Sequence, residues 1–296
     1  MFLTNNFISA FFYSIINFMH QNVVSNYVII ILILTLIIKF VLLPLDFKQR
    51  ESTLKMSKLQ PKIADIKARY KDPQTQNIKM RELYKKENVK MMSGCLPTII
   101  SLLIIMAFFG ALQQFANQEI AKLVLDASKV PGKVIDLPRF LWVRNIWQAD
   151  SGTAPVMPDA ASWTNIVRGL PQNLAAQVKN LDYQKVIAPT LEYYRGNFNG
   201  WYLFPLIVSV SMYFSMQYSM SLTAQAPGTP GQGPVMKLIF SAMIGFVCLT
   251  SNSLFAFYFF LTNIILIAQT FMFKKYYDYR ESKNNDKKNN RPEVSS

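Results

Sequence analysis

The chain has 296 residues, of which 51% are hydrophobic and 14% aromatic, while only 16% are charged, against roughly 25% in soluble domains. Its formal net charge is +14, but the basic residues lie between apolar runs rather than on one folded face, which argues against a nucleic-acid-binding protein. Two cysteines without a CxxC spacing and a single histidine argue against a disulfide framework or a zinc site. The composition is that of a membrane protein.

Residues 1–26 are predicted to form an amphipathic helix that lies on the outer leaflet of the membrane. Within FISAFFYSIINFMH, the apolar residues recur at helical spacing and form one stripe. A signal peptide is the alternative, but the segment has no basic n-region and no A-x-A cleavage site. We therefore favour the interfacial helix.

Five later segments are predicted to cross the membrane, because a bilayer core of roughly 30 Å requires about 20 apolar residues of helix. The predicted spans are 27–45, 96–112, 201–220, 235–251 and 254–273. The fourth is short and the least hydrophobic of the five. Only Asn252 and Ser253 separate the last two spans, which are therefore expected to form a tight hairpin.

The lysine and arginine content of the connecting segments orients the chain. Segment 46–93 contains thirteen Lys or Arg against six acidic residues, the tail 274–296 seven against four, and segment 113–200 nine against seven. Five spans place 46–93 and the tail on the same side, and their basic excess predicts that this side is cytoplasmic. The N-terminus and 113–200 are then extracytoplasmic, and 221–234 is a cytoplasmic loop.

Segment 46–93 is predicted to be a cytoplasmic hairpin of two helices. FKQRESTLKMSKLQPKIADIKARY is rich in good helix formers, and Pro61 is expected to kink or divide this arm. KDPQTQ is expected to be a turn, because Pro73 disfavours helix at the residue before it, and QNIKMRELYKKENV then resumes the helix. The alternative is a solvated hairpin without a specific role.

The outer segment 113–200 contains neither a repeat nor an enzymatic motif. LPRFLWVRNIW and NLAAQVKNL are expected to be short helices or interfacial pieces, with Trp142, Trp147 and Trp163 at the depth of the lipid headgroups. Nowhere does the chain contain a G-x-x-x-x-G-K-[ST], G-x-S-x-G or H-E-x-x-H motif, and the spans contain no Asp, Glu or His. We therefore predict that the protein is not an enzyme, and we expect no cofactor and no metal.

Neutral polar side chains and one lysine are scattered through the spans. They share helical faces within a span: Thr35 and Lys39 in the first, Ser101 in the second, Ser209, Tyr213 and Gln217 in the third, and Tyr258, Thr262 and Gln269 in the fifth. One interpretation is that these groups form hydrogen bonds to neighbouring helices, and the other is that they line a hydrated groove. For Lys39 the alternative to a groove is that its long side chain reaches the cytoplasmic interface.

The first two spans and the hairpin contain three distinctive stretches: LTLIIKFVLLPLDFKQRESTLKMSKLQPKIADIKARYKD, MRELYKKENV and SGCLP. Together they resemble the core of the YidC membrane protein insertases, within the wider YidC/Oxa/Alb superfamily. FPLIVSVSMYF and LFAFYFFLTNIILIAQ resemble, more loosely, the third and last core spans of that family.

The resemblance implies five core helices around a hydrophilic groove that is open to cytosol and lipid and closed outside. It aligns Lys39 with the single basic residue of that groove, usually arginine, Ser101 with a glutamine of the second span, and Asn263 with an asparagine of the last span. Lysine keeps the charge but lacks the planar guanidinium fork. SLLIIM replaces a proline-containing polar patch, and 113–200 is longer than the usual core loop.

By this resemblance the expected function is that of a membrane protein insertase and folding chaperone in a bacterial cell membrane, acting without nucleotide hydrolysis. The expected partners are nascent membrane proteins and the lipid bilayer, with the ribosome, through the basic tail, and the Sec translocon as further candidates. Substrate contact in the hairpin is expected at Met56, Leu59 and Ile63. The alternative is a small-solute transporter or channel subunit, which paired inverted repeats or two broken helices would indicate.

Overall fold

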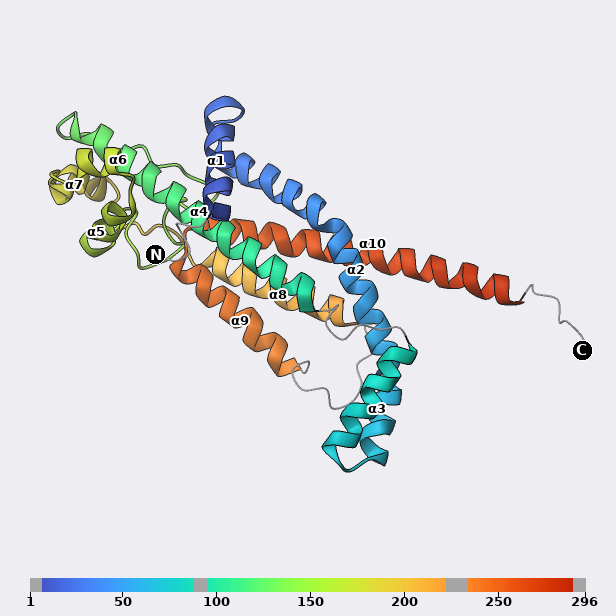
Figure 1. Ribbon diagram of the computed structural model, residues 1–296. Helices are drawn as coiled ribbons and strands as arrows, with labels where there is room; N and C mark the ends of the chain where they lie inside the picture. The colour runs from blue at the N-terminus through green and yellow to red at the C-terminus, as the bar shows by residue number, and fades with distance from the viewer. Residues whose placement is uncertain (1–6, 88–94, 222–233, 290–296) are drawn as a thin grey trace, which may run out of the picture.

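The computed structural model describes residues 7–87, 95–221 and 234–289, and its regular structure in these ranges is helical, with one isolated bridge between Phe140 and Val143. The helices are α1 (Phe7–Asn22), α2 (Tyr27–Arg69), α3 (Pro73–Lys86), α4 (Cys95–Ser128), α5 (Ala160–Gly169), α6 (Gln172–Val178), α7 (Tyr183–Tyr193), α8 (Leu203–Ser221), α9 (Pro234–Thr250) and α10 (Ser253–Asn289). Helices α4, α8, α9 and α10 run along a common direction (Figure 1). The short helices α5–α7 lie at one end of this bundle and the α2–α3 hairpin lies at the other.

Helix α2 is one continuous helix of 43 residues that includes both the first predicted span and the first arm of the hairpin. The Asn26 side chain caps its start by accepting hydrogen bonds from the backbone N–H groups of Val28 and Ile29. Pro44 and Pro61 both lie inside the helix, so Pro61 does not divide the arm. Figure 1 shows α2 changing direction along its length, as expected where proline removes a backbone hydrogen bond.

The turn of the hairpin is shorter than the sequence suggested. Asp72 caps α3 by accepting a 2.8 Å hydrogen bond from the Thr75 N–H, and Pro73 opens the helix. Proline is tolerated at the first helical position because its missing N–H would have no partner there. The predicted turn KDPQTQ therefore contributes only its first two residues to the connection, and the rest is already helix.

Two helices run well past the expected ends of their spans, α4 to Ser128 and α10 to Asn289. The added part of α4 buries Phe115, Ile120 and Val124 in the main core, where the ends of α5, α6 and α7 pack against it. Packing therefore continues the helix beyond the apolar window, so the first 16 residues of segment 113–200 are helix rather than loop.

Three helical stretches are long and apolar enough to cross a membrane: Tyr27–Arg69, Ile100–Ser128 and Ser253–Arg280. Helix α9 is a shorter apolar helix. Helix α8 has 19 residues and does not belong to these three.

Helices α9 and α10 are joined by a short connection, but they do not pack as a pair. Helix α8 packs extensively against both, and α9 and α10 hardly touch (Figure 1). The helices α8 and α9 approach closely at Gly245, where a Cβ atom would lie 1.9 Å from the Ser209 Oγ. Small residues allow such close approach between membrane helices. The expected tight hairpin of the last two spans is therefore wrong in its packing, because α8 occupies the place between them.

Segment 113–200, named the outer unit after the side on which it is expected, forms a compact unit that contains the end of α4 and the short helices α5–α7. NLAAQVKNL includes α6, as expected, whereas LPRFLWVRNIW is not helical: it contains a tight turn with Leu141 at a φ of 52°. Trp147 and Trp163 are buried inside the unit, and Trp163 stacks on Tyr183 with ring centroids 4.4 Å apart. Burial also raises the pKa of the Tyr183 phenol. These two indoles contribute to the core of the outer unit instead of facing headgroups.

Candidate functional site

The candidate site lies where α2 approaches α10, toward the hairpin end of the bundle. Lys39 is half-buried on α2, next to the exposed apolar side chains of Phe40 and Val41. Asp46 and Arg50 follow at spacings of seven and four residues, which place all three on one helical face. Lys39 and Arg50 both interact electrostatically with the Asp46 carboxylate. The site thus contains two cations and one anion.

Arg50 and its neighbour Phe47 fix the crossing of α2 and α10. The Arg50 guanidinium lies 5.7 Å from the Phe273 ring centroid, and the rings of Phe47 and Phe273 are 5.5 Å apart. Lys39 lies eight residues before Phe47 on α2, and Ile265 lies eight residues before Phe273 on α10. Thr262 and Gln269 lie three residues before and four residues after Ile265, about one helical turn away on either side.

Five buried polar atoms of this bundle have no hydrogen-bond partner among the described residues: Asp46 Oδ2, Ser215 Oγ, Ser241 Oγ, Thr262 Oγ1 and Gln269 Oε1. They belong to α2, α8, α9 and α10. Four of them lie in the middle of their helix or toward its hairpin end, whereas Thr262 lies in the first third of α10, one turn after Tyr258. Buried polar atoms in folded proteins are almost always paired with protein or with water. Water or an incoming polar group is therefore the natural partner for these five.

The opposite end of the bundle is closed by aromatic side chains. Phe108 and Tyr258 have ring centroids 4.6 Å apart, and Phe109 and Phe255 4.5 Å apart. Tyr258 is buried in this apolar layer, so it contacts Phe108 of α4 in the structure. The aromatic end also contains two buried polar atoms without a partner among the described residues, His20 Nδ1 and Trp147 Nε1, so unpaired polar atoms occur at both ends of the bundle.

The other predicted groove residues have varied surroundings. Thr35 is buried and donates a 2.6 Å hydrogen bond to the Ile31 carbonyl oxygen. Ser101 and Tyr213 are half-buried. Asn263 is buried and donates a 2.9 Å hydrogen bond to the Ser211 Oγ, which links α10 to α8.

Gln217 is exposed on α8 and accepts a hydrogen bond from the buried Lys237 ammonium of α9. Lys237 is thus a third basic group of the bundle, besides Lys39 and Arg50. Sequence reasoning missed Lys237, and it missed Asp46 and Arg50 as partners of Lys39. Lys237 could have been noticed as a lone lysine in the apolar run VMKLIF. Asp46 and Arg50 could have been noticed because they follow Lys39 at spacings of seven and four residues, on the same helical face.

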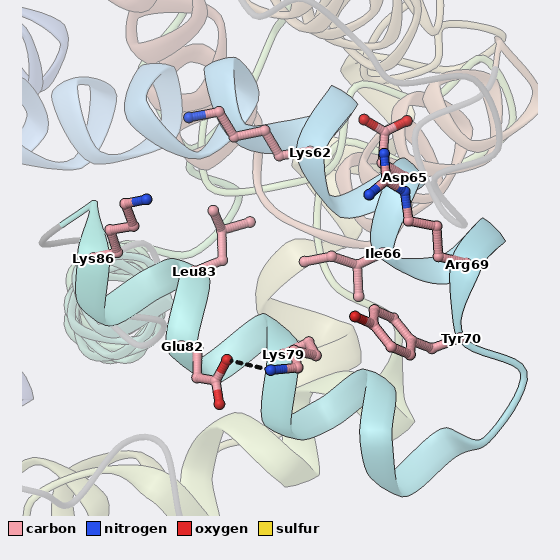
Figure 2. Close-up of a pocket in the computed structure, with 9 residues that line it drawn as sticks. All are labelled: Lys62, Asp65, Ile66, Arg69, Tyr70, Lys79, Glu82, Leu83 and Lys86. Carbon is pink, nitrogen blue, oxygen red and sulfur yellow. Dashed lines mark hydrogen bonds and ion pairs between the residues drawn. The ribbon is translucent and has the colours of Figure 1, made fainter.

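The α2–α3 hairpin has its own pocket of about 340 Å³ between its two arms (Figure 2). Ile66 and Leu83 point toward each other across it, and its rim includes the basic residues Lys62 and Lys86. Lys62 donates a 2.5 Å hydrogen bond to Glu87 and thereby lowers the pKa of that carboxyl.

The hairpin residues predicted to contact substrate differ in the exposure of their side chains. Met56 is half-buried, whereas Leu59 and Ile63 are buried. Movement of the surrounding chain would therefore be required before Leu59 or Ile63 could touch a substrate. Throughout the parts of the chain that the structure describes, no three His, Cys, Asp or Glu residues are grouped so that they could hold a metal ion.

The fold and the site define a class of protein: an all-α polytopic membrane protein whose helices bury polar groups, several of them without a partner among the described residues. The family model described as "60Kd inner membrane protein" matches residues 18–282, nearly the whole chain. The chain therefore belongs to this family, which includes the YidC, Oxa and Alb proteins, and it is a bacterial membrane protein.

Individual relatives agree with this assignment. The chain is 35% identical over 199 residues to a membrane protein insertase YidC of Fusobacterium nucleatum, which covers 66% of this chain and 88% of the relative. It is 24% identical over 251 residues to the Clostridium perfringens protein of the same name, covering 83% and 78%. A Parabacteroides distasonis relative, also named membrane protein insertase YidC, is 27% identical over 262 residues, which are 85% of this chain but 32% of that protein.

Proposed function

We propose that this protein is a membrane protein insertase and folding chaperone, which helps newly made proteins enter the bilayer through a hydrophilic groove without nucleotide hydrolysis. Its relatives are named membrane protein insertases, and this name supplies the activity. The observation that supports the groove is the set of unpaired buried polar atoms in α2, α8, α9 and α10, together with the half-buried Lys39 of α2. No feature of the described residues favours the alternative of a solute transporter.

The proposal includes the topology expected from the loop charges. Five spans, 27–45, 96–112, 201–220, 235–251 and 254–273, place the hairpin and the tail in the cytoplasm. The N-terminus and the unit formed by α5–α7 lie outside. In this orientation the hairpin end of the bundle, with Lys39 and Asp46 leading toward it, faces the cytosol, where substrates arrive, and the aromatic layer lies toward the outer side.

The groove would act by lowering the cost of moving polar groups into the bilayer. A charged side chain at the bilayer centre costs about 2.5–3.5 kcal/mol on insertion scales. A substrate tail that enters a hydrated groove crosses only the remaining, thinner part of the apolar layer. Thr35, Ser101, Tyr213, Gln217, Tyr258, Thr262, Asn263 and Gln269 are the neutral polar residues that we propose for this path.

Lys39 would attract acidic residues in the translocating tail. At an effective dielectric constant near 20, an ammonium and a carboxylate 4 Å apart interact by about 4 kcal/mol before desolvation is subtracted. Asp46 already interacts electrostatically with Lys39 and Arg50, so a substrate carboxylate would compete with Asp46 for these two cations. The attraction is therefore transient, which allows the tail to leave.

The hairpin and the tail would meet the substrate and the ribosome first. Apolar side chains between the hairpin arms, including Leu59 and Ile63, would contact an apolar segment once the arms separate, and Met56 can adapt to varied partners. The basic tail 274–296 is suited to ribosomal RNA or anionic headgroups. The Sec translocon is a further partner that we propose.

Insertion assays with Lys39 variants test the groove. Lys39→Arg should support insertion as well as the wild type, whereas Lys39→Ala and Lys39→Glu should impair a substrate with an acidic tail more than the same substrate with its tail acids replaced. Lys179→Ala, which removes an exposed lysine of the outer unit, is the control for the loss of one positive charge.

The readout is the fraction of tail protected after protease treatment of vesicles. If Lys39→Ala inserted both substrates as well as the wild type, Lys39 would have no role in the groove. Its side chain would then simply extend to the cytoplasmic interface.

A further inference from the structure

A second pocket, at the outer end of the bundle, is not used by the proposed groove. It has a volume of about 300 Å³ and lies between α4, α5, the loop that contains Trp147 and Gln148, and the connection of α9 to α10. Its polar lining includes Gln113, Asn117 and Asn252. None of the side chains that line it is charged.

The uncharged lining of this pocket offers both hydrogen-bond donors and acceptors, and one of the donors is buried and unpaired. Trp147 is 3% exposed, and its buried indole N–H has no partner among the described residues. The Asn117 Oδ1 accepts from the Gln113 Nε2 at 3.2 Å, and the Asn252 Oδ1 accepts from the Phe255 N–H at 2.9 Å. Both side-chain oxygens are thus engaged, while their amide N–H groups and the Trp147 N–H have no acceptor within the described part of the chain.

The donors and acceptors that line the pocket indicate which kind of molecule it could bind. The buried Trp147 N–H requires an acceptor, because a buried donor left unpaired costs free energy. The absence of a lysine or arginine from the lining disfavours a phosphate headgroup or an acidic side chain, since a buried charge requires a partner. An extended peptide fits: its carbonyl oxygens accept, and its own N–H groups can donate to the Gln113 and Gln148 side-chain oxygens.

The position of the pocket points to the origin of the peptide. Gln113 directly follows the second predicted span, and Asn252 lies between the fourth and the fifth. In the proposed topology, the pocket is therefore at the outer surface, beside the place where a translocated tail would leave the bilayer. We infer that this pocket binds the uncharged backbone of a substrate segment that has just been translocated, and so opposes its return. This inference rests on the proposed insertase function.

Site-specific photocrosslinking in the full-length protein tests the inference. A benzophenone amino acid is placed at Asn165, an exposed residue of α5 that lines the pocket, and at Thr164, an exposed neighbour that does not line it. A third position, Tyr213, reports on the proposed groove. The probe is a ribosome-bound nascent membrane protein with a neutral tail. Its chain is either stalled on the ribosome at successive lengths or released.

The Asn165 position should capture the tail only at lengths that allow translocation, and Thr164 should capture much less. Asn117→Leu should lower the yield at Asn165, relative to Tyr213, by about 2- to 12-fold, the equivalent of one hydrogen bond. Equal capture by Asn165 and Thr164, or capture of lipid alone at Asn165, with Tyr213 still capturing substrate, would overturn the pocket and leave the insertase intact. Failure of Tyr213 and Asn165 alike would refute both.

Discussion

Replacing Asp150 by alanine should destabilise the outer unit and the start of α8. The Asp150 side chain is fully buried and accepts four hydrogen bonds. The donors are the Trp142 Nε1 at 2.9 Å and the backbone N–H groups of Trp201, Tyr202 and Phe204 at 2.7, 3.1 and 2.6 Å. Gly200 is adjacent, where a Cβ atom would lie 1.9 Å from the Asp150 Oδ1. No other residue fits at position 200 while Asp150 keeps its place.

The magnitude follows from the number of donors left without an acceptor. Each buried donor without a partner costs about 1–3 kcal/mol, so four donors at the low end give a loss of roughly 4 kcal/mol for Asp150→Ala. Asp150→Asn keeps an oxygen for Trp201 and Tyr202 but turns an N–H toward Trp142 and Phe204, so about half of that loss is expected. For a chain of 296 residues that unfolds cooperatively, each kcal/mol lowers the midpoint of thermal unfolding by about 2–4 °C.

Thermal unfolding in detergent, followed by tryptophan fluorescence, measures the effect. Asp150→Ala should lower the midpoint by about 8–16 °C and Asp150→Asn by about half as much. Asp126→Asn is the matched control, because this carboxylate lies on an exposed pair with Lys129 and should change the midpoint little. A midpoint for Asp150→Ala within the range of that control would refute the reasoning.

Three further predictions concern topology and dynamics. Single cysteines at the exposed positions Gln74 and Lys179, in a chain without Cys95 and Cys248, should react with an impermeant thiol reagent from opposite sides of the membrane, and reaction of both from one side would rule out the topology. The amides of α3, which has no fully buried residue, should exchange faster than those of α4, and equal protection would contradict a mobile hairpin. Deleting residues 281–296 should weaken co-sedimentation with ribosomes in a salt-dependent manner; unchanged binding at low salt would show that the tail only aids solubility.

Much of the helical architecture could be predicted from local sequence. Apolar runs of sufficient length, proline at the start of α3 and polar caps such as Asn26 act within a few residues, so their effect is visible in the chain itself. The same holds for Lys39, because a charge in an apolar run is conspicuous wherever the run folds. The family resemblance of the first two spans was also a property of contiguous residues, and the family match confirms it.

The ends of helices and the choice of neighbours could not be read in this way. Helix α4 continues past its apolar window because Phe115, Ile120 and Val124 bury themselves against the main core. Helix α8 separates α9 from α10 through contacts such as Gly245 with Ser209, which are far apart in sequence. Local periodicity describes which face of a helix is apolar, but not which other helix covers it.

The sequence by itself determined the class of the protein, the apolar segments and the one conspicuous lysine, because hydropathy and charge act through composition over short stretches. Only the tertiary structure decided that Lys237 reaches Gln217, and that the loops of the outer unit close around Asp150 beside an uncharged polar pocket. These features depend on atoms brought within about 3–4 Å across separate helices and loops, and electrostatic and hydrogen-bond energies fall away too steeply with distance for sequence spacing to reveal them.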